Sequence, residues 1–230
     1  MTSKTIVVVG ASRGIGRAIV ELLAKNRSTK IYALARNKEK LISNFGDFSN
    51  VHCASFDLSH SIAGQLADIF QEESKIDILI NNAGTLVNKP FESITHEEFT
   101  QSYQINTIGV METVQYFIQK MNASHSHIVN ISSMGGFQGS MKFAGLAAYS
   151  TSKAALCSFT ELFAEEYKAT NIRMNCLCLG AVQTEMLEDA FPGYSAPLSP
   201  QQMADFIVDF AENASRYING KIIPVSLSTP

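Results

Sequence analysis

A tyrosine and a lysine stand four residues apart in the stretch AAYSTSKAAL, residues 147–156. In a helix, Tyr149 and Lys153 would leave the same face with their Cβ atoms about 5–6 Å apart. Their neighbours are Ala, Ser and Thr, which leave the space around both side chains open. A lysine ammonium favours the phenolate form of a nearby tyrosine, whose usual pKa is about 10. The pair is therefore a candidate acid–base group, with two unrelated surface side chains as the alternative.

A glycine-rich segment, Gly10-Ala-Ser-Arg-Gly14-Ile-Gly16, follows the first apolar run. Glycines permit a tight turn and let a phosphate approach the free N–H groups at a helix N-terminus. The spacing differs from the common G-x-G-x-x-G fingerprint. The segment indicates a dinucleotide site, and a purely structural turn is the alternative.

The end of the second apolar run indicates which dinucleotide is bound. A site for NAD presents Asp or Glu there to the ribose 2′-hydroxyl, whereas arginine suits the 2′-phosphate of NADP. The chain has Ala35-Arg36 and no acid, and Arg13 lies within the glycine loop. Either arginine alone could be a solvated surface residue. Together they predict NADP(H) as the cofactor.

Short apolar runs alternate with segments of helical spacing along the whole chain. Strands are expected at 5–9, 30–35, 51–56, 76–81, 127–132, 172–179 and 221–226. Capping-box sequences at Thr95–Glu98 and Ser199–Gln202 indicate two helix starts. This alternation is typical of βαβ units with a parallel sheet covered on both faces. We expect an α/β fold, one doubly wound domain over residues 1–230 with about seven strands, whose ligands bind beyond the carboxyl ends of the strands.

Composition and charge narrow the class of protein. With 46% hydrophobic and 17% charged residues, the chain of 230 residues is typical of a globular domain. A net charge of −3 with scattered basic residues argues against nucleic acid and anionic membranes as partners. No apolar run reaches the roughly 18 residues of a membrane span, and the N-terminus lacks signal-peptide features. We expect a cytoplasmic protein.

Cysteines and histidines give no metal-binding pattern in the sequence. The spacing of the four cysteines fits no disulfide framework, and Cys176 and Cys178 alternate within an apolar run, as two thiols packed in a core would. His125 and His127 form a pair without a third ligand. No metal is expected.

A series of motifs between residues 5 and about 186 resembles the short-chain dehydrogenase/reductase family, in the same order. They are GASRGIG (10–16), NNAG (81–84), QINTIG with Asn106, ISS (131–133), YSTSK (149–153) and LGAVQTEM (179–186). The resemblance implies a Rossmann fold. It also implies hydride transfer between a nicotinamide and a carbonyl or alcohol.

The resemblance assigns catalytic roles to four residues. Tyr149 would be the general acid in reduction, assisted by Lys153, which would also bind the nicotinamide ribose. Ser133 would orient the substrate oxygen, and Asn106 would hold a water that links the lysine to solvent. Ser132 is the alternative to Ser133, and a helix cap is the alternative role for Asn106.

The resemblance also implies a set of cofactor contacts besides Tyr149 and Lys153. They are Gly10, Ser12, Arg13, Gly14, Ile15, Gly16, Arg36, Asp57, Leu58, Asn82, Ala83, Gly84, Val182 and Thr184. Asp57 would meet the adenine amino group, and Val182 and Thr184 the carboxamide and phosphate. The NNAG segment has a structural alternative, because the amide of Asn81 could bridge neighbouring strands.

Apolar side chains on both sides of the motifs predict an apolar pocket mouth, with core or dimer contacts as the alternative. They are Met134, Phe137, Met141, Phe143, Met186, Leu187, Phe191 and Tyr194. The segment at about 185–199 is short for a substrate lid. The C-terminus lacks the closing Gly-Gly of many relatives, so a homodimer through helices near 104–122 and 149–168 is favoured over a homotetramer.

These observations predict an NADPH-dependent carbonyl reductase acting on a small molecule. An NADP-binding regulator without catalysis is the second reading, although such proteins typically lose the tyrosine or lysine. A non-redox enzyme, such as a dehalogenase or dehydratase, is the third.

Overall fold

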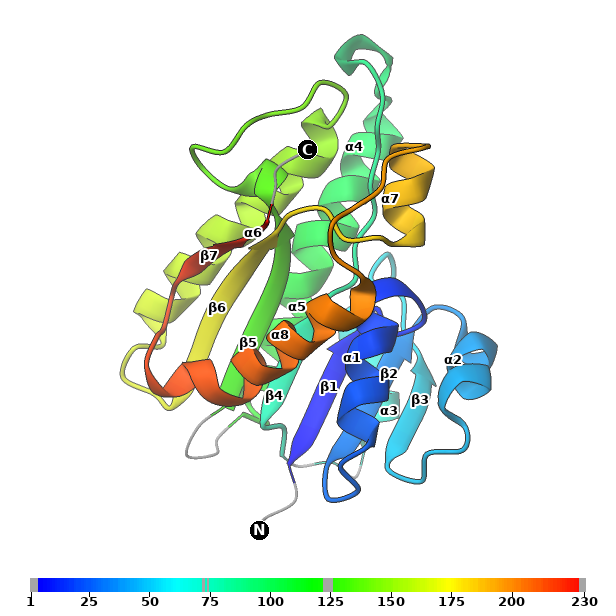
Figure 1. Cartoon of the computed structure of the whole chain (residues 1–230). Helices are drawn as coiled ribbons and strands as arrows, with labels where there is room; N and C mark the ends of the chain where they lie inside the picture. Colours follow the sequence, from blue (N-terminus) through cyan, green and yellow to red (C-terminus); the bar gives the residue numbers. More distant parts are fainter. Residues whose placement is uncertain (1–3, 72, 74, 122–125, 228–230) are drawn as a thin grey trace.

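Seven strands form one parallel sheet in the order β3-β2-β1-β4-β5-β6-β7 (Figure 1). The computed structural model describes residues 4–71, 73, 75–121 and 126–227. The strands are β1 (Thr5–Val9), β2 (Lys30–Ala35), β3 (Val51–Ser55), β4 (Ile78–Asn81), β5 (Ser126–Ser133), β6 (Ile172–Leu179) and β7 (Ile222–Val225). The predicted α/β fold is confirmed.

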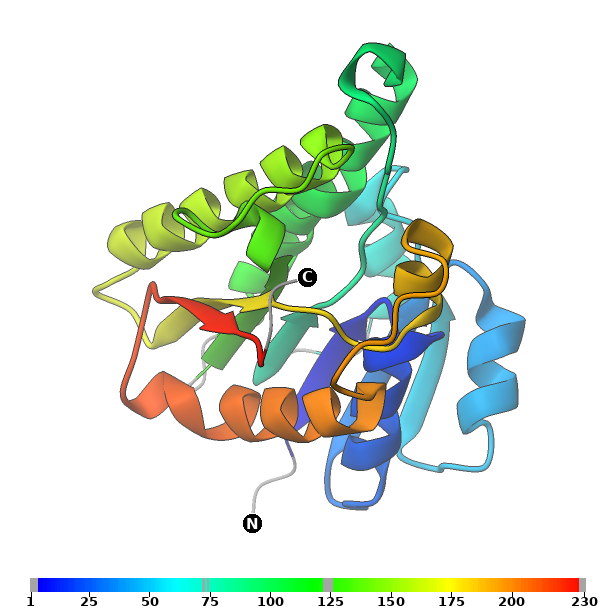
Figure 2. The ribbon, with the colours of Figure 1, turned by 45° about the horizontal axis from the view of Figure 1, so that its top comes forward.

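Helices cover both faces of the sheet, as Figure 2 shows. One face carries α1 (Gly14–Ala24), α2 (Lys38–Phe45) and α8 (Pro200–Asn213). The other carries α3 (Ile62–Ile69), α4 (His96–Tyr103), α5 (Gly109–Ile118) and α6 (Ala147–Glu166). Shorter elements are α7 (Glu185–Ala190), the 3-10 turns η1 (Phe91–Ser93), η3 (Met134–Gly136) and η4 (Ala214–Arg216), and the π-helix η2 (Gln104–Ile108).

Alternation along β1 explains why the strands are apolar throughout. Ile6 and Val8 pack into the core beneath α1 and α8, while Val7 and Val9 pack into the core beneath α3 and α5. All four side chains are buried. A parallel sheet with both faces covered requires apolar residues at successive positions, and the strand sequences meet that requirement.

Both predicted capping boxes are formed. Thr95 accepts from the amide of Glu98, and the side chain of Glu98 returns to the amide of Thr95. Ser199 and Gln202 make the same reciprocal pair at the start of α8, with Pro200 at its first position. These bonds satisfy amides that the first helical turn leaves without partners.

Buried polar contacts fix α6 against the sheet. Asn81 donates to the side-chain oxygen of Asn130 at 2.9 Å, which confirms that its amide bridges β4 and β5. Asn130 in turn donates to the hydroxyl of Thr160 at 3.0 Å. The hydroxyl of Ser132 donates to the main-chain carbonyl of Lys153 at 2.9 Å. The register of α6 on β5 is therefore set by specific bonds as well as by apolar packing.

Two findings concern membrane-spanning helices and the histidine pair considered as metal ligands. Within the described residues, none of the helices has the length and apolar character needed to cross a membrane. His127 is buried and uses both ring nitrogens, one toward the carbonyl of Ala211 and the other toward Asn175. It is therefore committed to the core, and His125 lies outside the described residues.

Candidate active site

A cavity of about 390 Å³ lies beyond the carboxyl ends of the central strands. It brings together most of the residues predicted from the sequence. Its wall includes Gly10, Ser12, Arg13, Gly14, Ile15, Arg36, Asp57, Leu58, Asn82, Ala83, Gly84, Ser133, Tyr149, Lys153, Val182 and Thr184. Gly16 and Asn106 are not part of this wall.

The glycine loop is a tight turn that has no room for side chains. Gly10 has a φ of +86°, and a Cβ there would lie 2.6 Å from the backbone of Ala83. Asn82 donates to the carbonyl of Gly10 at 3.0 Å and joins the two loops. A Cβ on Gly16 would lie 2.1 Å from that same carbonyl. Gly16 therefore lets α1 approach the turn from behind, and its predicted contact with the cofactor stays a prediction.

Two exposed arginines stand on the wall formed by β1 and β2. Arg13 precedes α1 and Arg36 follows β2. Among the described residues neither guanidinium forms an ion pair with a carboxylate, in contrast to Arg17, which is paired with Glu21 at 2.7 Å. The two positive charges are available to an anionic ligand in the cavity.

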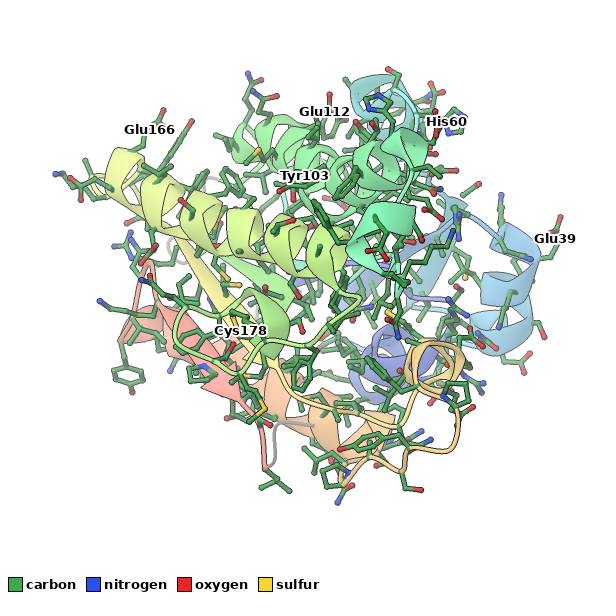
Figure 3. The ribbon with its side chains drawn as sticks, turned by 90° about the horizontal axis from the view of Figure 1, so that it is seen from above. Glu39, His60, Tyr103, Glu112, Glu166 and Cys178 are labelled. Carbon is green, nitrogen blue, oxygen red and sulfur yellow. The ribbon has the colours of Figure 1, made fainter. Side chains whose placement is uncertain are left out.

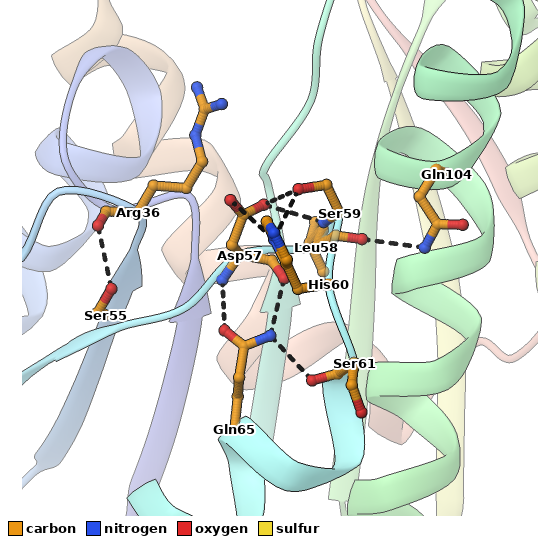
Figure 4. Close-up of polar contacts among 9 residues, drawn as sticks. All are labelled: Arg36, Ser55, Asp57, Leu58, Ser59, His60, Ser61, Gln65 and Gln104. Atoms are coloured by element: carbon orange, nitrogen blue, oxygen red, sulfur yellow. Dashed lines mark hydrogen bonds and ion pairs between the residues drawn. The ribbon is translucent and has the colours of Figure 1, made fainter. Parts of the chain in front are cut away.

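Asp57 follows β3 and, like Arg36, is part of the cavity wall; Figure 4 shows both residues. Burial raises the pKa of this carboxyl, but hydrogen bonds from the hydroxyl and amide of Ser59, with the charges of His60 and Arg36, outweigh burial and lower it. Gln65 holds the backbone of Asp57 through its amide and carbonyl. Asp57 is thus an ionised and positioned hydrogen-bond acceptor at this end of the cavity.

Tyr149 and Ser133 meet at the opposite end. Burial raises the pKa of Tyr149, and its hydrogen bond with Ser133 lowers that pKa only in part. The ammonium of Lys153 donates to the carbonyl of Ile131 at 2.8 Å and is not among the groups that shift the Tyr149 pKa. The depressed tyrosine pKa expected from the four-residue spacing is therefore not found with the protein's own groups.

Lys153 is buried beneath the cavity floor. Burial lowers the pKa of its ammonium to about 8, because the charged form loses solvation, although the three nearby cysteines raise it slightly. A Cβ on Gly84 would lie 3.3 Å from Lys153 Nζ and 3.2 Å from Asn106 Oδ1. The missing side chain at Gly84 therefore leaves the lysine open to the cavity.

Asn106 sits within the π-helix η2 and is fully buried. Its side-chain oxygen accepts from the amide of Thr85 at 2.8 Å, and its nitrogen donates to the Thr85 carbonyl and to Ser152 Oγ. Both amide hydrogens are used within the protein. The side chain thus clamps the loop after β4 to α6, and the predicted role in holding a water stays a prediction.

The structure separates the roles of the two adjacent serines on β5. Ser132 is buried and donates to the carbonyl of Lys153, while Ser133 is half-buried and interacts with Tyr149, whose pKa it lowers. The hydroxyl of Ser133 also accepts from the amide of Gly135 at 3.1 Å. Because successive strand residues face opposite sides, only one of the pair can stand beside the phenol.

Apolar side chains from two segments line the rest of the cavity. Of the eight predicted at its mouth, Met134, Phe143, Met186, Leu187 and Phe191 are in the wall. Phe137 packs instead against buried cysteines, and Met141 is 62% exposed. The short helix α7 is capped by Thr184, whose hydroxyl accepts from the amide of Leu187. It covers one side of the cavity, as a short lid would.

Some residues at the site carry no sequence signal that would have singled them out. Leu86 and Gln101 belong to the cavity wall, and Ser152 holds Asn106 from α6. Leu86 lies in a loop without periodicity. Gln101 belongs to a surface helix, and Ser152 reads as one of several small residues near Tyr149. Only the folded arrangement relates them to the site.

Comparisons with known proteins agree with this geometry. A family model described as short chain dehydrogenase matches residues 4–195. The chain is 30% identical to a 3-oxoacyl-acyl-carrier-protein reductase of Aquifex aeolicus, over 98% of this chain and 97% of that protein. It is also 30% identical to a tropinone reductase homologue of Arabidopsis thaliana, over 98% and 91% of the two chains.

Solved structures of similar proteins contain either nicotinamide cofactor. The Pseudomonas aeruginosa protein RhlG, solved as an active-site complex with NADP, has a TM-score of 0.85 and 25% identity, with 98% of this chain and 96% of that chain covered. A 4-hydroxyisoleucine dehydrogenase complexed with NADH has a TM-score of 0.82 and 25% identity, covering 97% of each chain. From its sequence, its fold and the residues around its cavity, this chain belongs to the short-chain dehydrogenase/reductase family of oxidoreductases that use NAD(H) or NADP(H).

Proposed function

We propose that the chain is an NADPH-dependent reductase that converts a carbonyl group of a small apolar molecule to an alcohol. One observation carries the proposal: a single cavity contains two exposed arginines at one end and Tyr149 with Ser133 and Lys153 at the other. This is the arrangement required by a ligand with an anionic end and a reacting end.

The residues at the arginine end fit a phosphorylated dinucleotide. The turn at Gly10 leaves no side chain between the cavity and the start of α1, where amide groups favour an anion. Arg13 and Arg36 provide positive charge where a 2′-phosphate would lie, and β2 ends without an acid that would repel it. The ionised carboxylate of Asp57 supports the proposal that this residue accepts from an adenine amino group.

The reacting end supports proton donation in the direction of reduction. When bound, the nicotinamide supplies or accepts the hydride. Because burial raises the pKa of Tyr149, its phenol stays protonated at neutral pH. It can then give its proton to the oxygen of a reduced carbonyl, which Ser133 orients. Lys153 supplies positive charge at the floor, and Asn106 fixes the loop above it.

The predicted homodimer also stays a proposal. The two helical regions that the sequence pointed to carry the exposed apolar side chains of Ile108 and Leu162. They would be buried if two copies met there. The substrate site lies elsewhere, at the carboxyl edge of the sheet, so the reductase proposal does not depend on it.

The test of the catalytic proposal is an assay of NADPH oxidation. The purified chain is mixed with diketones, aryl ketones, sugars and 3-oxoacyl thioesters, and absorbance of NADPH is followed. We expect turnover with at least one apolar carbonyl, and a loss of about 100-fold or more in kcat for Tyr149→Phe because the proton donor is gone. NADPH binding, measured by fluorescence titration, should change little. Tight binding with no turnover on the panel would favour a regulatory protein instead.

The test of cofactor choice uses arginine variants. Removal of a charged hydrogen bond to phosphate costs about 1.5–3 kcal/mol, so Arg36→Ala and Arg13→Ala should each weaken NADPH binding about tenfold or more. NADH binding should be unaffected. Arg17→Ala is the matched control, since Arg17 lies one helical turn away and is paired with Glu21. Equal losses for NADPH and NADH would contradict the assignment.

A further inference from the structure

Three buried thiols converge behind the active site, on the α6 face of the sheet. Cys176 and Cys178 alternate along β6, and Cys157 comes from α6. Cys157 Sγ lies 3.9 Å from Cys176 Sγ and 3.5 Å from Cys178 Sγ, and all three sulfurs lie within 4.8 Å of one another. Figure 3 labels Cys178. Among the described residues, this is the one group of three potential metal ligands.

The sequence pattern does not reveal this cluster, because Cys157 lies far along the chain from Cys176 and Cys178. Strand alternation puts Cys176 and Cys178 on one face of β6, which predicts ordinary core packing. Cys157 lies two helical turns after Tyr149, on the same face of α6. Packing of α6 on β6 brings its sulfur to the other two.

The spacing of the sulfurs suits a shared ion. Thiolates bound to one zinc ion at about 2.3 Å lie about 3.8 Å from one another, close to the two distances found here. A disulfide would require two sulfurs to approach to about 2.05 Å. Either α6 or β6 would have to shift for a disulfide to form. A shared metal ion can bind the sulfurs at their present separation.

Other groups around the cluster complete a site for a cation. The hydroxyl oxygen of Ser132 accepts from Cys157 Sγ at 3.4 Å and is an oxygen close to the sulfurs. The ammonium of Lys153 interacts electrostatically with all three cysteines. Met134, which lines the active-site cavity, packs on the cluster. Met134 therefore contacts both the cluster and the cavity.

We propose that Cys157, Cys176 and Cys178 form a buried three-sulfur site for a thiophilic d10 metal ion such as Zn²⁺ or Cd²⁺. Soft thiolate ligands select such ions over Mg²⁺ or Ca²⁺. Binding of a divalent ion forms three metal–sulfur bonds, and each thiol that is protonated in the free chain gives its proton to solvent. The product carries a net charge of minus one, which Lys153 offsets. The site is independent of the proposed reductase activity.

The test is a titration of the reduced full-length chain with Cd²⁺ under anaerobic conditions. Cadmium thiolates absorb in the ultraviolet through sulfur-to-metal charge transfer, so occupancy is read directly without any activity assay. We expect saturation at about one Cd²⁺ per chain, with protons released as the ion binds in weakly buffered solution.

Variants locate the ion. Cys178→Ala should lower Cd²⁺ affinity about tenfold or more, because one of three ligands is lost. Cys53→Ala is the matched control, since Cys53 is a half-buried cysteine on β3 that lies outside the cluster, and it should leave the affinity unchanged. Cys157→Ser is a second, nearly isosteric variant should Cys178→Ala fail to fold, which thermal unfolding would reveal.

Several outcomes would overturn the proposal. They are the absence of a charge-transfer band in the wild-type chain, a band that Cys53→Ala removes, and a band that both cluster variants retain. A Cys157–Cys178 disulfide in the freshly purified chain, found by mass spectrometry of unreduced peptides, would also reject it and make the cluster a redox pair.

Discussion

Lys153 shows how burial changes what a residue can do. The residue is 4% exposed, and its ammonium donates to the main-chain carbonyl of Ile131. Loss of solvation disfavours the charged form, which brings the pKa of the group to about 8, near the pH at which enzymes usually work. The spacing in the sequence suggested that the lysine would tune Tyr149. In the structure burial shifts both pKa values, raising that of Tyr149 and lowering that of Lys153.

This burial predicts an alkaline limit on activity. Below a pH of about 8 Lys153 is an ammonium, and as the pH rises through that value it loses its proton and its charge. The kcat/KM for carbonyl reduction should therefore fall above a pH of about 8. In Lys153→Arg the arginine keeps its charge over this pH range, so the fall in kcat/KM above a pH of about 8 should disappear. The overall rate of this variant should be lower than that of the wild type. An unchanged alkaline limb in Lys153→Arg would show that another group causes it.

At the scale of elements, α6 is the helix that organises the site. It carries Tyr149, Lys153 and Cys157, and polar bonds hold it on β5. The π-helix η2 places Asn106 against it through Ser152. A π-turn is rare and costs regular hydrogen bonding, and such turns are frequent at functional sites. The asparagine is a poor helix former, which fits this irregular turn.

Thr160 tests how strongly α6 depends on its buried bonds. Thr160→Val keeps the shape but leaves the buried amide of Asn130 without its acceptor, so it should lower the free energy of unfolding by about 1–3 kcal/mol. Thr151→Val is the control, because Thr151 also bonds to the carbonyl four residues earlier in α6 but is exposed. Urea unfolding of both variants gives the comparison. Equal losses would mean that the bond to Asn130 contributes nothing.

At the scale of the whole molecule, His127 joins three elements. It lies on β5, donates from Nδ1 to the carbonyl of Ala211 in α8 at 2.9 Å, and accepts at Nε2 from Asn175 of β6 at 3.0 Å. Burial lowers its pKa to about 4, and the bond to Ala211 opposes this only in part. The neutral ring is therefore part of the folded state.

The low pKa of His127 predicts a stability that depends on pH. An unfolded histidine takes up a proton near pH 6.5, whereas the folded one does so only near pH 4. Stability should be full above about pH 6.5 and should decline as pH falls toward 4, by up to about 3 kcal/mol from this residue.

Urea unfolding at several pH values measures this effect. His127→Gln should be less stable than the wild type at pH 7, and the difference should narrow as the pH falls toward 4. His96→Gln, a change at an exposed histidine on α4, should leave the pH dependence as it is. If the free energies of unfolding of His127→Gln and the wild type differ by the same amount from pH 7 to pH 4, His127 is not the source of the pH dependence.

The sequence by itself determined the sheet and the loops that surround the cavity. Apolar runs mark strands because both faces of a parallel sheet are buried, and the turn at Gly10 requires a residue without a side chain. Both are local properties. They predicted the seven strands to within two residues at either end, and the two capping boxes. The order of motifs along the chain then predicted that Arg36, Asp57 and Tyr149 lie at the carboxyl edge of the sheet.

Only the tertiary structure decided which of these residues share the cavity and what their surroundings do to them. Gly16 and Asn106 serve packing and clamping, because the atoms they meet come from other segments. The pKa values of Tyr149 and Lys153 depend on loss of solvation, which no spacing encodes. Cys157 meets Cys178 only because α6 packs across β6. Contacts between distant segments decided these features, since burial and distance exist only in the folded chain.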